Sequence, residues 1–460
     1  MGGLPRRASV IEQARQESSV AVVDGGDLFW RGGALSDLRL SQQREKARLM
    51  AENMSSLGWD AWVPGESDWT LGVEFLQGLI RSYSLPVLAG NLRCGDTQYP
   101  GHRLVERDGR RIGFVGVVDY TLDGCEVEDP VEAAQEAIDA LAEPDVVVAV
   151  FHGSAQLDGN VLGAVDGIDF FLNGHSGRSM ANPKKVHDAF FVGSGRKGKK
   201  IGRLDLYWKS GNGPWIPQGE EGVVETRVER YRVIVERTQK SLEEATKKNV
   251  IERLEKRSKH YQEQIATLEK ELQSKNQSSS SRRFRNHLVS LDAQVADHPA
   301  TKKMLEDSKE RIEVLAKASA GTSRVDHLPF LGSETCRACH VPQYEQWKAT
   351  PHASAYATLV ADKRAMDSEC FACHVTGAHH PKGPQLPTSV GLLKDVGCES
   401  CHGPGQAHLA QPVGTMQAVA AEGKVDFRDA QYYLDIQKKK DGTLDVTFRQ
   451  VKRKSTGRVR

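Results

Sequence analysis

The residues best suited to chemistry form one pattern, Cys-x-x-Cys-His, which occurs three times in a short stretch. The copies are Cys336-Arg-Ala-Cys339-His340, Cys370-Phe-Ala-Cys373-His374 and Cys398-Glu-Ser-Cys401-His402. In this order two thiols can add across the vinyl groups of a haem while the adjacent histidine binds its iron. The sequence therefore predicts three covalently bound c-type haems, with His340, His374 and His402 as proximal iron ligands.

Zinc is the alternative, because paired cysteines also build zinc ribbons. A zinc site takes four ligands and does not need a histidine after each second cysteine. Six of the chain's eight cysteines lie in the three pentapeptides, and no thiol of this segment is left over. Haem accounts for all six, so we interpret the segment as haem-binding.

Low-spin haems need a second axial ligand, which is commonly another histidine. The segment has four further histidines, His352, His379, His380 and His408. We expect His352 and His408 to bind iron, together with one of the neighbouring pair His379 and His380. Local residues thus suffice for three six-coordinate irons.

The same segment resembles the multihaem cytochromes c typified by the tetrahaem electron acceptor of hydroxylamine oxidation. The matching stretches are 331–340, 344–347, 350–353, 373–377 and 396–405. The resemblance implies a mainly helical and loop-rich domain over 328–412, bis-histidine coordination and electron exchange with redox partner proteins. It also implies a fourth attachment motif after His408, which this chain does not have. We therefore expect three haems.

A second set of candidate ligands lies in the first half of the chain, where apolar runs end in polar residues. The run at 19–23 ends in Asp24-Gly-Gly-Asp27, and two later runs each lead to a histidine, His152 and His175. Such runs predict buried strands of an α/β domain, in which functional groups gather at the carboxyl ends of the strands. Two imidazoles and a carboxylate there suit a divalent metal such as Mn²⁺, Zn²⁺ or Mg²⁺.

These stretches, with Gly65-Glu66-Ser67-Asp68, resemble the metallophosphoesterase domain of periplasmic 5′-nucleotidases. The resemblance implies a four-layer αββα sandwich over residues 1–235, with two metals that activate water for attack on phosphate. Asp27 matches the aspartate that bridges the metals, and His152 and His175 match histidine ligands. Glu66 stands in place of an asparagine ligand, while the opening Asp-x-His motif and a second histidine after His175 are absent. We expect a degenerate domain that holds at most one ion, through Asp27, Glu66, His152 and His175.

Residues 236–322 are dense in charge and follow a helical pattern. The a and d positions of one heptad register are occupied by Ile251, Leu254, Tyr261, Ile265, Leu268 and Leu272. After a polar break at 274–281, helical spacing resumes with Phe284 and Leu288 and continues beyond Pro299. The pattern predicts a coiled-coil hairpin whose second helix is interrupted near Pro299, and such an arm permits a dimer. The last segment, 413–460, is expected to be a basic tail.

The chain has 460 residues and a formal net charge of +1, so its charge indicates neither a nucleic-acid nor a membrane partner. No apolar run reaches the length of a transmembrane helix. Haem is attached outside the cytoplasmic membrane in bacteria, which predicts a periplasmic or otherwise exported protein. No signal peptide follows Met1, so we expect the natural start to lie upstream or a targeting segment to have been removed. Cys94 and Cys125 can pair in an oxidising compartment, although isolated cysteines are more often buried apolar side chains.

Three functions are compatible with these patterns. The first is an exported multihaem cytochrome that transfers electrons and carries a degenerate phosphoesterase-like domain. The second is a metal-dependent phosphohydrolase with an accessory cytochrome segment, and the third is a multihaem oxidoreductase acting on a small nitrogen or sulfur compound. We favour the first, because the phosphoesterase motifs have lost ligands while the haem motifs are complete. No catalytic residue is assigned.

Overall fold

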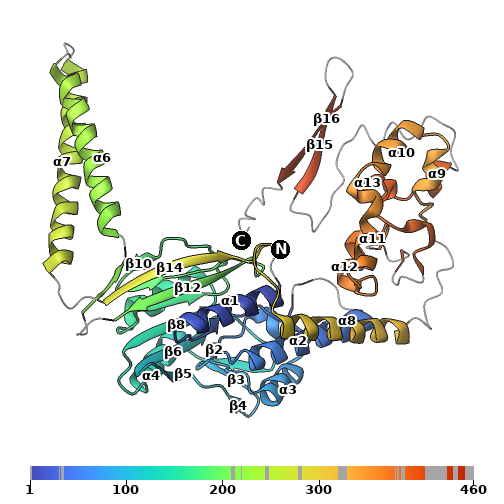
Figure 1. The fold of residues 1–460 in the computed structure, drawn as a ribbon, viewed down its shortest axis with the longest axis horizontal. Helices are drawn as coiled ribbons and strands as arrows, with labels where there is room; N and C mark the ends of the chain where they lie inside the picture. The colour runs from blue at the N-terminus through green and yellow to red at the C-terminus, as the bar shows by residue number, and fades with distance from the viewer. Residues whose placement is uncertain are drawn as a thin grey trace, which may run out of the picture. The chain divides into compact units, whose positions relative to one another are not determined.

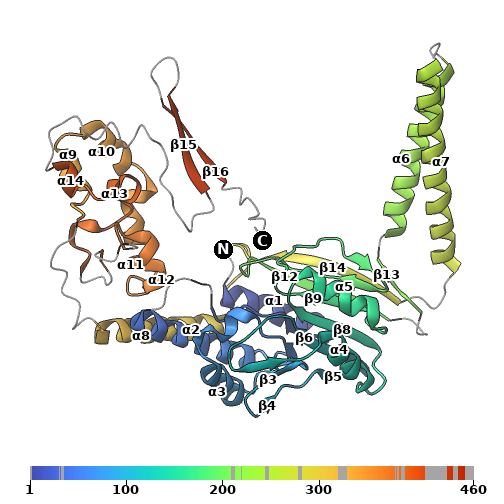
Figure 2. The same ribbon diagram turned by 180° about the vertical axis from the view of Figure 1, so that it is seen from behind.

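A computed structural model of the chain describes residues 3–30, 32, 36–208, 213–218, 220–243, 248–277, 282–319, 329–378, 380, 383–384, 389–409, 432–438 and 444–450. The chain divides into two compact units, Met1–Gly33 with Lys46–Glu306, and Ala34–Glu45 with Asp307–Arg460. Two helices, α2 (Asp37–Ser56) and α8 (Pro299–Ser319), contribute residues to both units. Figure 1 and Figure 2 show the elements from opposite sides.

The first unit is built on a six-stranded sheet in the order β10-β11-β9-β8-β6-β5. Its strands are β5 (His102–Arg107), β6 (Arg110–Val118), β8 (Val146–His152), β9 (Phe170–Asn173), β10 (Lys184–Val186) and β11 (Ala189–Phe191). The pairs β6–β8, β8–β9 and β9–β11 are parallel. Every residue of β8 is buried, as expected of a central parallel strand covered on both faces.

One face of this sheet is covered by α4 (Pro130–Asp139) and α5 (Ala155–Ala164). Asp129 and Ser154 cap the two helices by accepting hydrogen bonds from backbone N–H groups of their first turns. The buried side chains Ala134 and Val161 of these helices share a core cluster with Phe151 of β8. The predicted α/β character of the first half is therefore present.

The other face packs on a three-stranded sheet in the order β12-β14-β13, made of β12 (Lys200–Tyr207), β14 (Arg282–Ser290) and β13 (Trp215–Pro217). Phe284 of β14 is fully buried, with its ring centroid 5.0 Å from that of Phe170. The prediction of a helix through Phe284 and Leu288 is therefore wrong. Phe284 and Leu288 also lie on one face of a strand, in which alternate residues point the same way. The stretch is a strand because all eight residues of β12 pair with β14.

The predicted helical hairpin is present but lies earlier in the chain. It consists of α6 (Glu220–Glu243) and α7 (Lys248–Gln277), which lie side by side in both views. The ring of Tyr231 contacts that of Tyr261 at 5.1 Å, and Arg232 pairs with Glu269 at 2.7 Å. The second predicted helix does exist beyond Pro299 as α8, for which Pro299 is the first residue rather than an interruption.

Shorter elements complete the first unit. They are α1 (Leu4–Glu17), β1 (Val23–Asp24), β2 (Ala61–Trp62), η1 (Glu66–Leu71), α3 (Val73–Tyr83), β3 (Leu92–Cys94), β4 (Thr97–Gln98) and β7 (Cys125–Val127). A disulfide joins Cys94 of β3 to Cys125 of β7, two residues paired in register. Of the two alternatives that the sequence left open for these cysteines, the structure has the disulfide.

The second unit is made of short helices and loops, together with one end of α2 and most of α8. Its other elements are α9 (Ser333–Arg337), α10 (Val341–Lys348), η3 (Pro351–Ser354), α11 (Ala355–Ala361), α12 (Ser368–His374), η5 (Gly391–Leu393), α13 (Cys398–His402), α14 (Gln406–Leu409), β15 (Tyr432–Lys438) and β16 (Leu444–Gln450). Strands β15 and β16 form an antiparallel pair within the predicted tail. A small core gathers Phe371, Val375, Val390 and Leu393.

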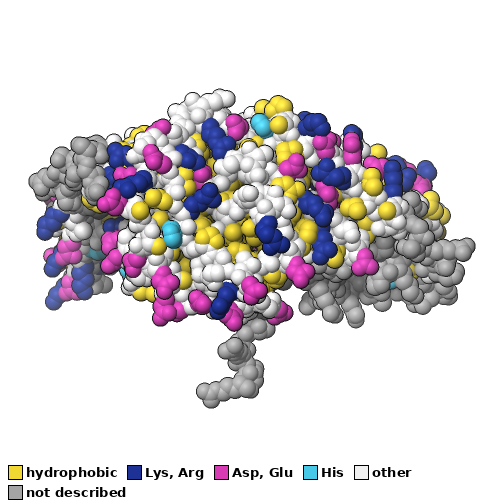
Figure 3. Space-filling model, turned by 90° about the horizontal axis from the view of Figure 1, so that it is seen from below, with side chains coloured by type: hydrophobic (Ala, Val, Ile, Leu, Met, Phe, Trp, Pro, Cys, Tyr) yellow, Lys and Arg dark blue, Asp and Glu magenta, His cyan; other side chains and the backbone are white. Residues whose placement is uncertain are grey.

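Surface properties agree with the composition. On the face shown in Figure 3, basic and acidic side chains are interspersed rather than gathered by sign, in keeping with a net charge of +1. Among the described residues, no helix combines the length and the apolar character needed to cross a membrane.

Candidate metal centre and haem-binding segment

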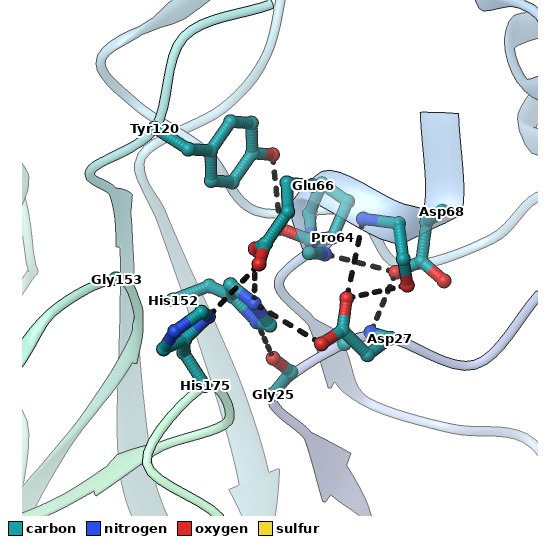
Figure 4. A network of polar contacts seen from close by, with 12 residues as sticks. Gly25, Asp27, Pro64, Glu66, Asp68, Tyr120, His152, Gly153 and His175 are labelled. Carbon is teal, nitrogen blue, oxygen red and sulfur yellow. Dashed lines mark hydrogen bonds and ion pairs between the residues drawn. The ribbon is translucent and has the colours of Figure 1, made fainter. Parts of the chain in front are cut away.

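The four predicted metal ligands of the first unit meet at the ends of strands. Asp27 follows β1, Glu66 begins η1, His152 ends β8, and His175 follows β9. One ligand atom from each of these side chains lies within 4.8 Å of those of the other three. Figure 4 shows the two imidazoles and two carboxylates converging. The sequence therefore identified a set of residues that the fold brings together.

Glu66 lies at the centre of this cluster. Its two carboxylate oxygens lie 2.8 Å from Nε2 of His152 and 2.9 Å from Nδ1 of His175. Nε2 of His152 is also 3.6 Å from a carboxylate oxygen of Asp27. The contact with His152 lowers the pKa of Glu66 to about 2, although burial opposes the shift. Glu66 is thus ionised at any physiological pH.

The tautomer of His152 follows from its other nitrogen. Its Nδ1 lies against the carbonyl oxygen of Gly25, so this nitrogen must donate and Nε2 faces the carboxylates. Burial lowers the pKa of this fully buried imidazole, but Glu66, Gly25 and Asp27 outweigh it, and the pKa is raised. A backbone carbonyl behind a ligating histidine is the usual arrangement at metal sites.

Asp68 holds the loops that carry Asp27 and Glu66, and sequence reasoning did not single it out as a site residue. It is fully buried and accepts hydrogen bonds from the backbone N–H groups of Asp27, Leu28, Phe29 and Gly65. Burial raises its pKa to about 6, against these donors. The signal in the sequence was its position three residues after Gly65, where a carboxylate can fold back on the start of η1.

Neighbouring groups restrict what else this site can bind. Ser67, in place of the family histidine, donates its hydroxyl to Asp27 at 2.6 Å. A Cβ at Gly65 would come within 2.3 Å of Asp27 and 2.4 Å of His152, so only glycine fits there. Tyr120 donates to the carbonyl of Pro64 and accepts from Trp69, which closes one side. Burial raises the pKa of Tyr120, which keeps its phenol neutral.

The donor set fits one divalent ion. Two imidazole nitrogens and two carboxylates suit Zn²⁺ or Mn²⁺ in four-coordinate or larger sets. The buried atoms Nε2 of His152 and Oε2 of Glu66 have no hydrogen bond of good geometry, as expected of metal-facing donors. A second ion would need further ligands, and the second histidine that the family resemblance implies after His175 is replaced here by Gly177.

In the second unit, each attachment motif lies on or beside a single helical turn. Cys370–His374 and Cys398–His402 fall in α12 and α13, and Cys336 lies in α9. None of these six cysteines forms a disulfide, and in each motif the first is half-buried and the second exposed. The unit also exposes apolar side chains, at Val341, Val360, Leu392 and Leu409. This pattern suits thiols that are covered by an apolar ring system.

Two imidazoles of this unit have a separation that would suit the two axial ligands of one iron. The rings of His340 and His408 have centroids 6.3 Å apart and planes inclined by 34°. Imidazoles on opposite sides of one metal, with bonds of about 2 Å, have centres about 6 Å apart. Nδ1 of His374 lies 2.7 Å from the carbonyl of Ala355, which leaves Nε2 free for iron. The residues present therefore fit haem.

The other predicted iron ligands are exposed, lie beside an aromatic ring or fall outside the described residues. His402 and His352 are exposed, and the carbonyl of His352 accepts a hydrogen bond from Val396. The ring of His380 lies edge-on to Phe330 at 5.5 Å. His379 falls outside the described residues. Ligation of iron by these histidines, and by His340, His374 and His408, remains a prediction.

Comparison with known proteins gives one set of relatives for each part of the chain. A family model described as cytochrome c554 and c-prime matches residues 335–403. The chain is 31% identical over 121 residues to cytochrome c-554 of Nitrosomonas europaea, which covers 23% of this chain and 52% of that protein. It is 24% identical over 275 residues to the trifunctional nucleotide phosphoesterase protein YfkN of Bacillus subtilis, which covers 49% of this chain and 19% of that protein. Both expected family resemblances are confirmed.

Further relatives and solved structures match the phosphoesterase-like part. The 5′-nucleotidase of Diplobatis ommata is 25% identical over 209 residues, 42% of this chain and 35% of that protein. The sulfate thiohydrolase SoxB of Thermus thermophilus, in complex with glycerol, superposes with a TM-score of 0.46 at 19% identity, over 68% of this chain and 47% of that one. The chain spans about a fifth to a half of the curated relatives named here. It is multidomain, with a metallophosphoesterase-like α/β fold followed by a cytochrome c554-like segment.

Proposed function

We propose that this chain is an exported cytochrome that carries three c-type haems and passes electrons between redox partner proteins. The observation that carries the proposal is the neighbouring pair His340 and His408, whose separation suits two axial ligands of one iron. The three attachment motifs and the match to cytochrome c554 relatives support it further. Haem iron, when bound, takes up and releases one electron as it changes between the ferric and ferrous states.

The residues of the chain serve this role in three ways. The cysteine pairs hold each ring by two thioether bonds, and His340, His374 and His402 bind the irons. The carbonyl of Ala355 orients His374 by accepting from its Nδ1. We assign the sixth position of the first iron to His408 and those of the other irons to His352 and to one of His379 and His380.

Haem content and spin state test this proposal. Protein produced with a haem-attachment system should carry three haems by mass spectrometry and should be low-spin by electron paramagnetic resonance. His408→Ala should convert about one third of the iron to high spin, whereas His260→Ala on α7 should leave the spectrum unchanged. Fewer than three haems would contradict the count, and an unchanged spectrum in His408→Ala would exclude that residue as a ligand.

A metal-dependent phosphohydrolase is the second candidate, because Asp27, Glu66, His152 and His175 converge. A divalent ion there would polarise a phosphoryl oxygen and activate water. We propose that the four-layer sandwich of the relatives is retained in this chain. We also propose that its metal site holds one ion and has little hydrolytic activity. Calorimetry measures Mn²⁺ binding, and an assay of phosphate release from nucleotides measures hydrolysis. Asp27→Asn is the test variant in both, and Asp123→Asn, at an exposed residue, is the control. Fast, chelator-sensitive turnover that Asp27→Asn abolishes would favour the hydrolase instead.

The proposal also includes export of the protein, and it bears on a possible oxidoreductase activity and on a dimer. The disulfide between Cys94 and Cys125 supports an oxidising, periplasmic location. An oxidoreductase acting on a small nitrogen or sulfur compound would need an open iron position, which a high-spin component that binds cyanide would reveal. A dimer through the hairpin has little support, because α6 and α7 pack on each other through Tyr231 and Tyr261.

A further inference from the structure

Glu399 is an unusual residue for its place in the chain. It is the first residue after the leading cysteine of the third attachment motif, and only 5% of it is exposed. The corresponding residue is an exposed arginine, Arg337, in the first motif and a buried apolar one, Phe371, in the second. A carboxylate buried at this position needs compensation for the water that it has lost.

That compensation comes from peptide groups. Both oxygens of Glu399 accept from the N–H of Leu331 at 2.9 Å. The N–H of Gly332 donates to one oxygen and that of Gly405 to the other, each at 2.7 Å. Among the described residues, none of the ion pairs includes Glu399. Backbone donors therefore replace water around the carboxylate, and no cation cancels its charge.

The same residue lies where two attachment motifs meet. Gly332 precedes α9, which carries Cys336, and Glu399 itself lies in α13. Ser333 accepts a hydrogen bond from the N–H of Cys398 at 3.1 Å, which ties the two turns together. The side chains of Cys336 and Cys398 are neighbours, and Glu399 lies close enough to Cys336 to interact with it electrostatically.

We propose that Glu399 is a positioning residue whose buried negative charge lowers the reduction potentials of the haems at the first and third motifs. The inference rests on the proposed function, since it requires haem at both motifs. A nearby anion stabilises a ferric centre more than a ferrous one, and the effect is large where water is excluded. In the second motif, held by α12, Phe371 occupies this position. A buried carboxylate, Asp367, lies 3.5 Å from the thiol of Cys370, but the guanidinium of Arg364 is close to it and offsets its charge.

The test compares haem-loaded full-length protein with E399Q and with the control E334Q. Glu334 lies in α9 beside the first motif but is exposed, so water screens its charge. Spectropotentiometry of E399Q should show two of three haems shifted about tenfold toward the reduced form, which is about 59 mV for one electron. E334Q should shift them less than twofold. Equal shifts in both variants, or no shift in E399Q, would overturn the inference.

Haem mapping covers the case in which E399Q assembles poorly. Loss of haem confined to the peptides of Cys336 and Cys398 would support a role at these two motifs. Loss that also includes the peptide of Cys370 would overturn it, because Glu399 would then serve the whole unit. Absence of haem from the first and third motifs of the unaltered protein would instead refute the proposed function.

Discussion

Replacement of Phe284 by alanine tests whether β14 belongs to the first unit rather than to a helical arm. The side chain is fully buried, and its ring centroid lies 5.0 Å from that of Phe170 and 4.7 Å from that of Phe190. A buried Phe→Ala change costs about 3–5 kcal/mol in total, and its two aromatic contacts place Phe284 in the upper part of this range. We expect a loss of about 4–5 kcal/mol, a large share of the stability of a typical domain.

Urea unfolding measures this loss. Far-UV circular dichroism follows the first unit, and haem absorbance follows the second. With a slope of about 3 kcal/mol/M in urea, the midpoint of the first unit should fall by about 1.5 M. Tyr261→Ala on α7 is the matched control, because its ring is only partly buried and contacts only the hairpin. If both variants lose similar stability, Phe284 does not join the two sheets and our account of the core is wrong.

Three further predictions concern other parts of the chain. Gln42 is fully buried, accepts from the N–H of Ser368 at 2.9 Å and donates to the carbonyl of Met366 at 2.7 Å. Gln42→Leu should therefore destabilise the second unit by about 1–3 kcal/mol, measured by urea unfolding at the haem absorbance, while the exposed Ser41→Ala should not. Mn²⁺ affinity should fall as the pH goes from 8 to 6, because the pKa of His152 is raised and a protonated imidazole cannot bind metal. Glu66 stays ionised over this range. Constant affinity in calorimetry would exclude His152 as a ligand. The disulfide between Cys94 and Cys125 closes a loop with a sequence separation of 31. Its loss in Cys94→Ser/Cys125→Ser should lower the free energy of unfolding by about 3–4 kcal/mol. An unchanged melting temperature would show that the disulfide contributes nothing to stability.

Features that depend on the order of neighbouring residues could be predicted from the sequence. A Cys-x-x-Cys-His pentapeptide specifies its cofactor whatever surrounds it, and apolar runs that end in His152 and His175 specify strand ends. The contact of Asp68 with Gly65 is local, but its hydrogen bonds to Asp27 and Leu28 could not be predicted, because these peptide groups lie some 40 residues away. Similarly, nothing in the first half of the sequence indicates that Gln42 packs against Met366 and Ser368.

The error at 282–290 has a specific cause. Phe284, Leu288, Leu291 and Val295 follow one another at intervals of three and four, which fits a helix, while Phe284, Asn286, Leu288 and Ser290 share one face of a strand. Local sequence does not decide between these periods. The choice depends on β12, whose eight residues pair with β14 and lie about 80 positions earlier.

The connection between β13 and β14 limits how this protein can be shortened. The two strands are parallel neighbours, with Trp215 opposite Arg282, and the whole hairpin lies between them in the chain. Parallel neighbours need a crossover of a dozen or more residues, so the hairpin cannot be replaced by a tight turn. Beyond that minimum, added length costs little, because loop-closure entropy grows only with the logarithm of loop length. The hairpin is therefore a segment whose length can vary during evolution, or in engineering, while the sheet keeps its strand order.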